Sequence, residues 1–207
     1  MNILTAEDPV EYELEGIGQV HVRENIGYTF ASALRSFLRQ DPEVILVGEI
    51  RDKETVDIAL KASLTGHLVF STIHTNDAPS TITRLQNMGT PNYLIAAALT
   101  LIMAQRLARK TCSECKVIDE NITPKLLNSI GFLPEQSARA KIYKGKGCDQ
   151  CNQSGYKGRM GIYEILEVTK ELKQGVLSNL QQIELEAIAK KGGFKTMQTM
   201  GHDLLLS

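Results

Sequence analysis

The chain has no tryptophan, only 5% aromatic residues and a formal net charge of -1 over 207 residues. A nucleic-acid partner is therefore not expected, because base-stacking side chains are few and no cationic surplus is present. No hydrophobic run approaches the roughly 20 residues that cross a bilayer. The N-terminal residues lack the basic and apolar regions of a signal peptide. These absences predict a cytosolic protein without a membrane span.

Short β-branched runs alternate with amphipathic segments along the first half of the chain. Strands are predicted over 3–6, 16–22, 44–50 and 67–74, and helices over 30–39, 53–64, 79–88 and 92–109. Thr29, Asp52 and Asp77 precede three of these helices and are good N-caps. The alternation predicts an α/β sheet with crossover helices.

The composition changes at Cys112, after which the chain is rich in lysine, glycine and cysteine. This stretch predicts a small inserted module, followed by a strand at 161–168 and three short helices near 169–177, 181–191 and 196–205. We therefore predict three parts. They are an α/β core over 1–109, a cysteine-containing module over 110–160 and a strand with a helical subdomain over 161–207.

A buried strand over 44–47 leads directly into Gly48 and Glu49. In open α/β sheets, ligands bind beyond the carboxyl ends of the strands. A carboxylate in that place can hold a magnesium-bound water or the attacking water. The pattern is typical of the Walker B strand of a nucleotide hydrolase.

Three acidic residues, Glu7, Asp8 and Glu11, follow the first predicted strand in the same way. If the two strands are neighbours, their carboxylates meet at one sheet edge, where one could position magnesium and another could polarise water. The alternative is a solvated acidic turn. Arg51 is a basic residue near these carboxylates, and contact with nucleotide or a neighbouring subunit is one possibility for it.

Two histidines bracket the strand predicted over 67–74. His74 lies in a polar strand end that points toward the edge carrying Glu49, which makes it a functional candidate. His67 lies at the start of that strand, so a structural role or a subunit contact is favoured for it. A lone histidine at a strand end is also often just a hydrogen-bonded surface residue.

The cysteines form two C-x-x-C pairs, Cys112 with Cys115 and Cys148 with Cys151. Two such pairs are the usual pattern for a structural zinc ion with four thiolate ligands. Free thiols or a redox C-x-x-C are the alternatives. Neither pair follows a strand and opens a helix as a redox pair does, so zinc is favoured.

Taken in order, these motifs resemble those of the secretion ATPases that drive type IV pilus assembly and type II secretion. The matching segments are 7–12 (the family's aspartate box), 38–42 with 47–52 (its atypical Walker B), and 65–67 with 71–78 (its histidine box). Segments 104–107 and 158–164 and both cysteine pairs extend the resemblance to nearly the whole chain. The cysteines point to the assembly or export branch rather than the retraction branch.

The resemblance implies a RecA-like, hexameric motor on the cytoplasmic face of the inner membrane. Such a motor would hydrolyse ATP with magnesium and act on an inner-membrane platform protein. By resemblance, Glu7 is the candidate catalytic carboxylate and Glu49 organises magnesium and water. His74, and less strongly His67, would sense the γ-phosphate or couple subunits. Asp8, Glu11 and Arg51 would bind nucleotide or magnesium, or couple subunits.

One motif of the family is missing, because no G-x-x-x-x-G-K-[ST] phosphate loop occurs in the sequence. We therefore expect a C-terminal fragment with a partial RecA-like sheet, which alone binds ATP weakly and does not hydrolyse it. The alternative, from another class, is a non-enzymatic zinc-stabilised module that contacts other components of the secretion machinery. A phosphate loop shortly upstream in the gene would favour the motor.

Overall fold

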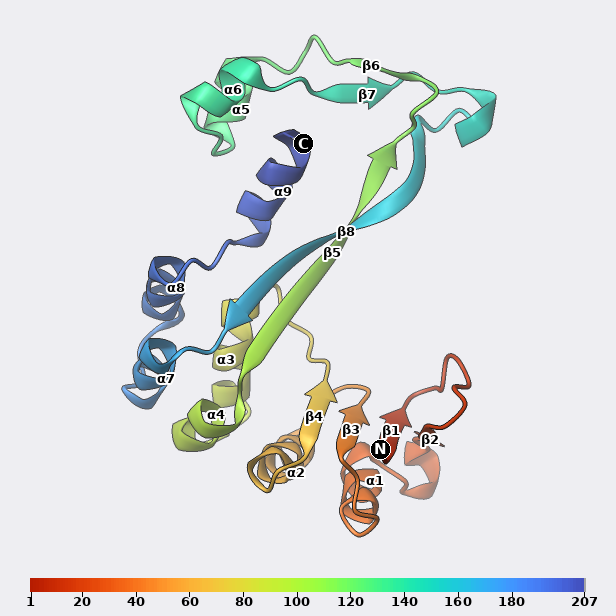
Figure 1. Cartoon of the computed structure of the whole chain (residues 1–207), viewed down its shortest axis with the longest axis vertical. Helices are drawn as coiled ribbons and strands as arrows, with labels where there is room; N and C mark the ends of the chain where they lie inside the picture. Colours follow the sequence, from red (N-terminus) through yellow and green to blue (C-terminus); the bar gives the residue numbers. More distant parts are fainter. Residues whose placement is uncertain (207) are drawn as a thin grey trace. The chain divides into compact units, whose positions relative to one another are not determined.

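The computed structural model describes residues 1–206, which form two compact units (Figure 1). The first unit contains Met1–Ile102 and Leu166–Gly193, and the second contains Met103–Ile165 and the segment that starts at Phe194. The predicted division into 1–109, 110–160 and 161–207 stays a prediction. Among the described residues, none of the helices has the length and apolar character needed to cross a bilayer.

The first unit is built on a four-stranded sheet in the order β2-β1-β3-β4. Its strands are β1 (Ile3–Glu7), β2 (Gly18–His21), β3 (Val44–Val47) and β4 (Leu68–Ser71). All three pairings are parallel, with Ala6 opposite Val47 and Val47 opposite Ser71. The carboxyl ends of β1, β3 and β4 therefore lie at one edge, as the alternating sequence pattern predicts.

The helices of this unit begin where the sequence predicts their caps. They are α1 (Phe30–Phe37), α2 (Lys53–Leu64), α3 (Ala78–Asn87), α4 (Asn92–Ala98), α7 (Lys170–Leu177) and α8 (Gln182–Lys191), with a 3-10 turn η1 (Glu24–Ile26). The side chains of Thr29, Asp52 and Asp77 each accept a hydrogen bond from a backbone N–H in the first turn of α1, α2 and α3. The predicted N-caps are confirmed.

The core of the sheet forms between its strands and α1 and α2. Phe37, Leu34, Ile45, Val47 and Val56 are almost entirely buried. Burying each such side chain contributes about 1.5–3 kcal/mol of hydrophobic free energy. Strands β3 and β4 end at Val47 and Ser71, earlier than the predicted limits at 50 and 74. The residues beyond them leave the regular strands, although the N–H groups of Gly48 and Ile50 still donate to the carbonyls of Ala6 and Thr72.

The helix predicted over 92–109 is wrong in its second half. Helix α4 ends at Ala98, and Leu101–Thr111 forms strand β5, which pairs with β8 (Tyr156–Glu167). The segment contains good helix formers, but its partner strand lies about fifty residues away in sequence, and tertiary pairing overrides local propensity. Arg109 therefore does not end a helix, and its guanidinium lies over the Tyr156 ring at 4.1 Å from the centroid.

The second unit holds the cysteines and a small helical layer. Its elements besides the β5–β8 ribbon are β6 (Lys116–Ile118), α5 (Pro124–Ser129), α6 (Pro134–Arg139), β7 (Tyr143–Gly145), the 3-10 turn η2 (Asp149–Cys151) and α9 (Met197–Leu206). Strands β6 and β7 are antiparallel. Helix α9 is held at its first residue and near its middle, since buried Glu164 accepts a hydrogen bond from the Met197 N–H at 2.6 Å and His202 stacks on Phe132.

Candidate functional site

The carboxylate of Glu49 lies just beyond β3 and is held by two basic side chains. Its Oε1 accepts from Arg51 Nη2 at 2.6 Å, and its Oε2 lies 3.2 Å from His74 Nε2. The structure thus brings together Glu49, Arg51 and His74, three of the residues singled out from the sequence. The ionised carboxylate and the exposed His74 ring together form a surface that can bind a polar ligand.

The turn that presents Glu49 depends on Gly48. Its N–H donates to the Ala6 carbonyl at 2.7 Å, and its own carbonyl accepts from the Thr72 hydroxyl at 2.6 Å. A Cβ at this position would lie 2.9 Å from the Ala6 carbonyl oxygen, closer than side-chain atoms approach backbone. Only glycine lets the end of β3 lie this close to β1 while Glu49 turns out of the sheet.

Glu7 ends β1 and has its own set of donors. The Thr5 hydroxyl donates to Glu7 Oε1 at 2.5 Å, and Gln19 Nε2 donates to the same oxygen at 2.9 Å. These two hydrogen bonds, with a further one from the Glu11 backbone, outweigh burial and lower the pKa of Glu7 below its usual value. Glu7 is therefore kept ionised by donors that differ from those of Glu49.

Asp8 and Glu49 share a partner. Arg51 Nη2 lies 3.4 Å from Asp8 Oδ2 as well as 2.6 Å from Glu49, and Arg51 Nη1 lies 3.4 Å from Glu24 Oε1. The hydrogen bond from Arg51, followed by its charge and that of His74, lowers the pKa of Glu49. The same contact raises the pKa of Arg51. The ends of β1 and β3 are thus tied together by one guanidinium.

His67 and Glu11 lie apart from this cluster of side chains. His67 precedes β4, so it is at the amino end of the sheet, where its Nδ1 contacts the Ala62 carbonyl at 3.0 Å and the Thr65 hydroxyl at 3.2 Å. Its contacts are those of a residue that closes helix α2. Glu11 is exposed and reaches the site through its backbone alone.

Three residues around the site were not identified from the sequence. Gln19 and Thr5 hold Glu7, and Glu24 contacts Arg51. Thr5 could have been found, because residues two apart in a strand share a face. Gln19 and Glu24 give no such signal, since their place depends on how β2 and η1 pack against the end of β1.

A magnesium ion would find few direct protein ligands at this edge. Among residues 1–206, the cysteines are the one group of three or more side chains of metal-ligating type that converge on a point. Both oxygens of Glu49 have basic partners. This arrangement is compatible with magnesium chemistry, because that ion is usually held by one or two carboxylates plus water and substrate phosphates.

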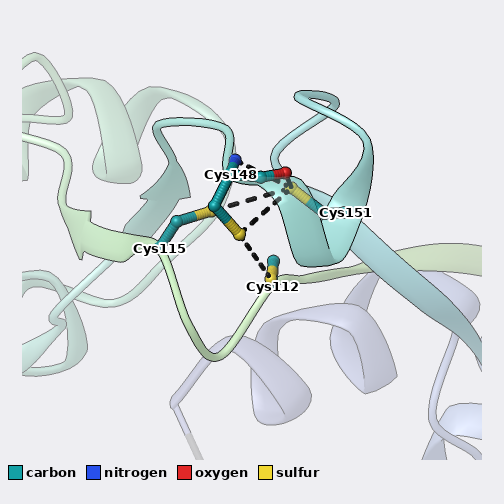
Figure 2. A group of neighbouring side chains, drawn as sticks. All are labelled: Cys112, Cys115, Cys148 and Cys151. Carbon is teal, nitrogen blue, oxygen red and sulfur yellow. Dashed lines mark hydrogen bonds between the residues drawn. The ribbon is translucent and has the colours of Figure 1, made fainter.

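The four cysteine side chains converge from two loops, as Figure 2 shows. Their sulfur atoms all lie within 4.8 Å of one another, with contacts of 3.9 Å for Cys112–Cys148, 3.9 Å for Cys115–Cys151 and 3.7 Å for Cys148–Cys151. A tetrahedron with Zn–S bonds of about 2.3 Å requires sulfur separations of about 3.8 Å. The donor set and spacing fit zinc, so the predicted convergence of the cysteines is confirmed.

Backbone N–H groups stabilise the thiolate form of one cysteine in this cluster, which is the form that binds a metal ion. The N–H groups of Cys148 and Gly155 both donate to Cys151 Sγ at 3.3 Å. Burial acts to raise the pKa of Cys151, but these donors outweigh it and hold the pKa at about 6. For Cys148, burial dominates and raises the pKa to about 11. A cation would draw all four groups into the thiolate form.

Two glycines close the loop that carries Cys148 and Cys151. A Cβ at Gly145 would lie only 2.0 Å from the Gly155 carbonyl oxygen. The backbones at these two positions are therefore in direct contact, and the Cys112 N–H donates to the Gly155 carbonyl at 3.0 Å.

Comparison with known proteins identifies the family of this chain. The family described as type II/IV secretion system protein matches residues 1–207. The chain belongs to this family. A type II/IV secretion system protein from Acinetobacter baylyi, named type IV pilus assembly ATPase PilB, is 50% identical over 202 residues, which cover 97% of this chain and 34% of that protein.

Other members of the type II/IV secretion system family show similar matches. The putative type II secretion system protein E of Escherichia coli is 47% identical over 190 residues, covering 92% of this chain and 38% of that protein. The solved structure of the pilus retraction motor PilT with bound ADP matches with a TM-score of 0.64 and 30% identity, covering 96% of this chain and 47% of that one. The chain thus spans about a third of its curated relatives' length.

Proposed function

We propose that residues 1–207 provide the carboxylate and histidine side of an ATP-hydrolysing site in a protein that powers type IV pilus assembly or type II secretion. The observation that carries this proposal is Glu49, held between Arg51 and His74 at the edge where β1 ends in Glu7. The names of the relatives, a type IV pilus assembly ATPase and type II secretion system proteins E, support the same assignment.

In the proposed reaction, a water attacks the γ-phosphorus of ATP as the bond to the ADP oxygen breaks. Glu7, ionised and held by Thr5 and Gln19, polarises that water and accepts its proton. Glu49 would hold a magnesium-bound water, and the exposed His74 ring can contact the γ-phosphate. Magnesium, when bound, would neutralise charge on the transferred phosphoryl group.

Glu7→Gln tests this assignment in the protein that carries residues 1–207 together with a phosphate loop. Removal of a general base typically costs 10²–10⁴-fold, so we expect kcat to fall by at least ~100-fold. Glu54→Gln is the matched control, because Glu54 lies on α2 and pairs with Arg35 instead. Equal rates for Glu7→Gln and Glu54→Gln would remove Glu7 from the mechanism.

The phosphates must be held by residues outside 1–207, because this sequence has no phosphate loop. We infer that the 207-residue chain alone binds ATP weakly and does not hydrolyse it. The check is a turnover assay on that chain with Glu49→Gln as the blank. Magnesium-dependent hydrolysis above the blank would refute this part of the proposal.

The convergence of the cysteines also favours a second role. In this role, the zinc-stabilised module forms a surface that binds other components of the machinery. We propose a hexameric, cytoplasmic assembly at the inner membrane with a platform protein as partner, following the family resemblance. Replacing Cys112 and Cys115 by serine should release zinc and weaken association with the platform protein. If association stays unchanged when zinc is gone, the module does not serve as that surface.

A further inference from the structure

Arg51 lies among three carboxylates that come from three separate segments. Asp8 follows β1, Glu24 belongs to η1, and Glu49 follows β3, at 3.4, 3.4 and 2.6 Å from the guanidinium nitrogens. The guanidinium also lies over the Phe30 ring, 5.9 Å from its centroid. A planar fork with several fixed donors is suited to holding several acceptors in a defined geometry.

The two oxygens of Glu49 have different partners. Oε1 is bound by Arg51, whose other contacts fix its orientation, while Oε2 faces His74, whose side chain is 90% exposed. The Glu49 side chain itself is only 19% exposed. Arg51 is thus anchored by the fold, whereas His74 can leave Oε2 at little cost in buried contacts.

Arg51 is a poor candidate for a phosphate ligand in this arrangement. Three carboxylates surround one guanidinium, so the cluster formed by Asp8, Glu24, Glu49 and Arg51 carries an excess of negative charge. A phosphate that approached Arg51 would have to displace a carboxylate and face the others. The positive charge of Arg51 is already balanced by carboxylates of the protein itself.

We propose that Arg51 is a positioning residue that holds Glu49 by Oε1 and ties it to Asp8 and Glu24, leaving Oε2 as the oxygen that serves the reaction. Oε2 contacts the exposed His74 ring. This inference rests on the proposed function for its consequence in catalysis. The contact between Arg51 and Glu49 can be tested without ATP.

The first test follows the titration of the Glu49 carboxyl by NMR in the 207-residue chain. The charged groups that contact Glu49 are Arg51 and His74, and those that contact Arg51 are Asp8 and Glu24. Arg51→Gln removes the cation that favours ionised Glu49, so the midpoint should move to higher pH.

Arg35→Gln is the matched control for this titration. Arg35 is also a half-exposed arginine in an ion pair, but its partner is Glu54. We expect the Glu49 midpoint to stay where it is in that variant. A midpoint that is the same in Arg51→Gln as in the wild-type chain would overturn the proposal. If Arg51→Gln does not fold, Arg51→Met replaces it, since it removes the same charge and hydrogen bond to Glu49 while keeping a long side chain over Phe30.

The second test measures ATP hydrolysis in the protein that also carries a phosphate loop. Misplacing a catalytic group costs roughly 10²-fold, so Arg51→Gln should lower kcat by ~10- to 100-fold and change KM for ATP by less than ~3-fold. Arg51→Lys should keep the low midpoint of Glu49 but recover little of kcat, because an ammonium cannot hold three carboxylates in one plane.

The outcomes separate this inference from the function on which it rests. A raised KM with unchanged kcat would make Arg51 a nucleotide ligand and overturn the positioning role. If the wild-type protein does not hydrolyse ATP, the proposed function fails. In that case the NMR titration alone decides whether Arg51 holds Glu49.

Discussion

At the scale of single residues, the two glutamates at the sheet edge are kept ionised by different means. Hydroxyl and amide donors from Thr5 and Gln19 hold Glu7, whereas charge from Arg51 and His74 holds Glu49. Both pKa values are lowered. A site with two separately supported carboxylates can assign water activation to one and metal organisation to the other.

Thr5→Val should reduce the pH dependence of stability. The folded pKa of Glu7 is lowered by Thr5 and Gln19, so Glu7 contributes stability that is present above its unfolded pKa and lost as pH falls through the folded pKa. Without the Thr5 hydroxyl, the free energy of unfolding should change less between about pH 6 and about pH 3, as measured by urea unfolding. Thr81→Val is the control.

That control is well matched, because Thr81 is also buried but pairs with the Thr75 hydroxyl rather than with a carboxylate. Thr81→Val should lower stability by a similar amount at both pH values. If both variants show the same pH dependence, the Thr5 hydrogen bond does not influence the ionisation of Glu7.

Cys151→Ser should abolish tight zinc binding. The Cys151 sulfur accepts two N–H hydrogen bonds and is the ligand that ionises most easily, with a pKa of about 6. Atomic emission should find about one zinc per wild-type chain and far less in the variant. Ser113→Ala, between the first two cysteines, should retain the metal. Full zinc content in Cys151→Ser would show that the cysteines are not a four-ligand site.

Residue types and spacing identify the individual site residues better than they identify their partners. The cysteine convergence follows from two C-x-x-C pairs, and Glu49 follows from its place after a buried strand. The contacts of Arg51 with Asp8 and Glu24 could not be predicted, because they join segments up to 43 residues apart through side-chain geometry.

At the scale of elements, local patterns determine the helices of the first unit. These local patterns correctly predict three N-caps and the parallel sheet. Strand β5 does not, because a segment of Leu, Met, Ala, Gln and Arg has helical propensity and becomes a strand only by pairing with β8. The short elements of the cysteine module are equally hard to predict, since loop contacts and the metal cluster fix them.

Gly145→Ala should destabilise the second unit. An added Cβ would lie 2.0 Å from the Gly155 carbonyl oxygen, so the two ends of the loop that carries Cys148 and Cys151 must separate. We expect weaker zinc retention against a chelator and a lower free energy of unfolding, by about 1–3 kcal/mol as for other overpacked positions.

Gly201→Ala is the control for this change. Gly201 lies within helix α9, and its Cβ would meet Ile162 at 4.0 Å, an ordinary contact. Alanine favours a helix interior over glycine, so this variant should gain roughly 0.5–1 kcal/mol. Equal stability of Gly145→Ala and wild type would contradict the described close approach of Gly145 and Gly155.

At the scale of the whole molecule, the chain consists of two compact units with different sources of stability. The first has a parallel sheet with a buried apolar core. The second has short strands and a cysteine cluster that would be closed by a metal ion. Metal binding to such a small module contributes directly to its folding free energy.

Zinc removal should therefore affect one unit more than the other. After chelation, limited proteolysis should cut within Met103–Ile165 much faster, while Met1–Ile102 keeps its resistance. Hydrogen exchange read by mass spectrometry gives the same comparison segment by segment. A uniform loss of protection across both units would contradict the assignment of separate stability to each.

The central claim is that the edge carrying Glu7, Glu49 and His74 is one side of an ATP-hydrolysing site. The most direct measurement is steady-state ATP hydrolysis by the protein that carries residues 1–207 with a phosphate loop, comparing wild type with Glu49→Gln. We predict magnesium-dependent hydrolysis in the wild type and at least a ~100-fold lower kcat in the variant. Equal rates in the two proteins would contradict the account.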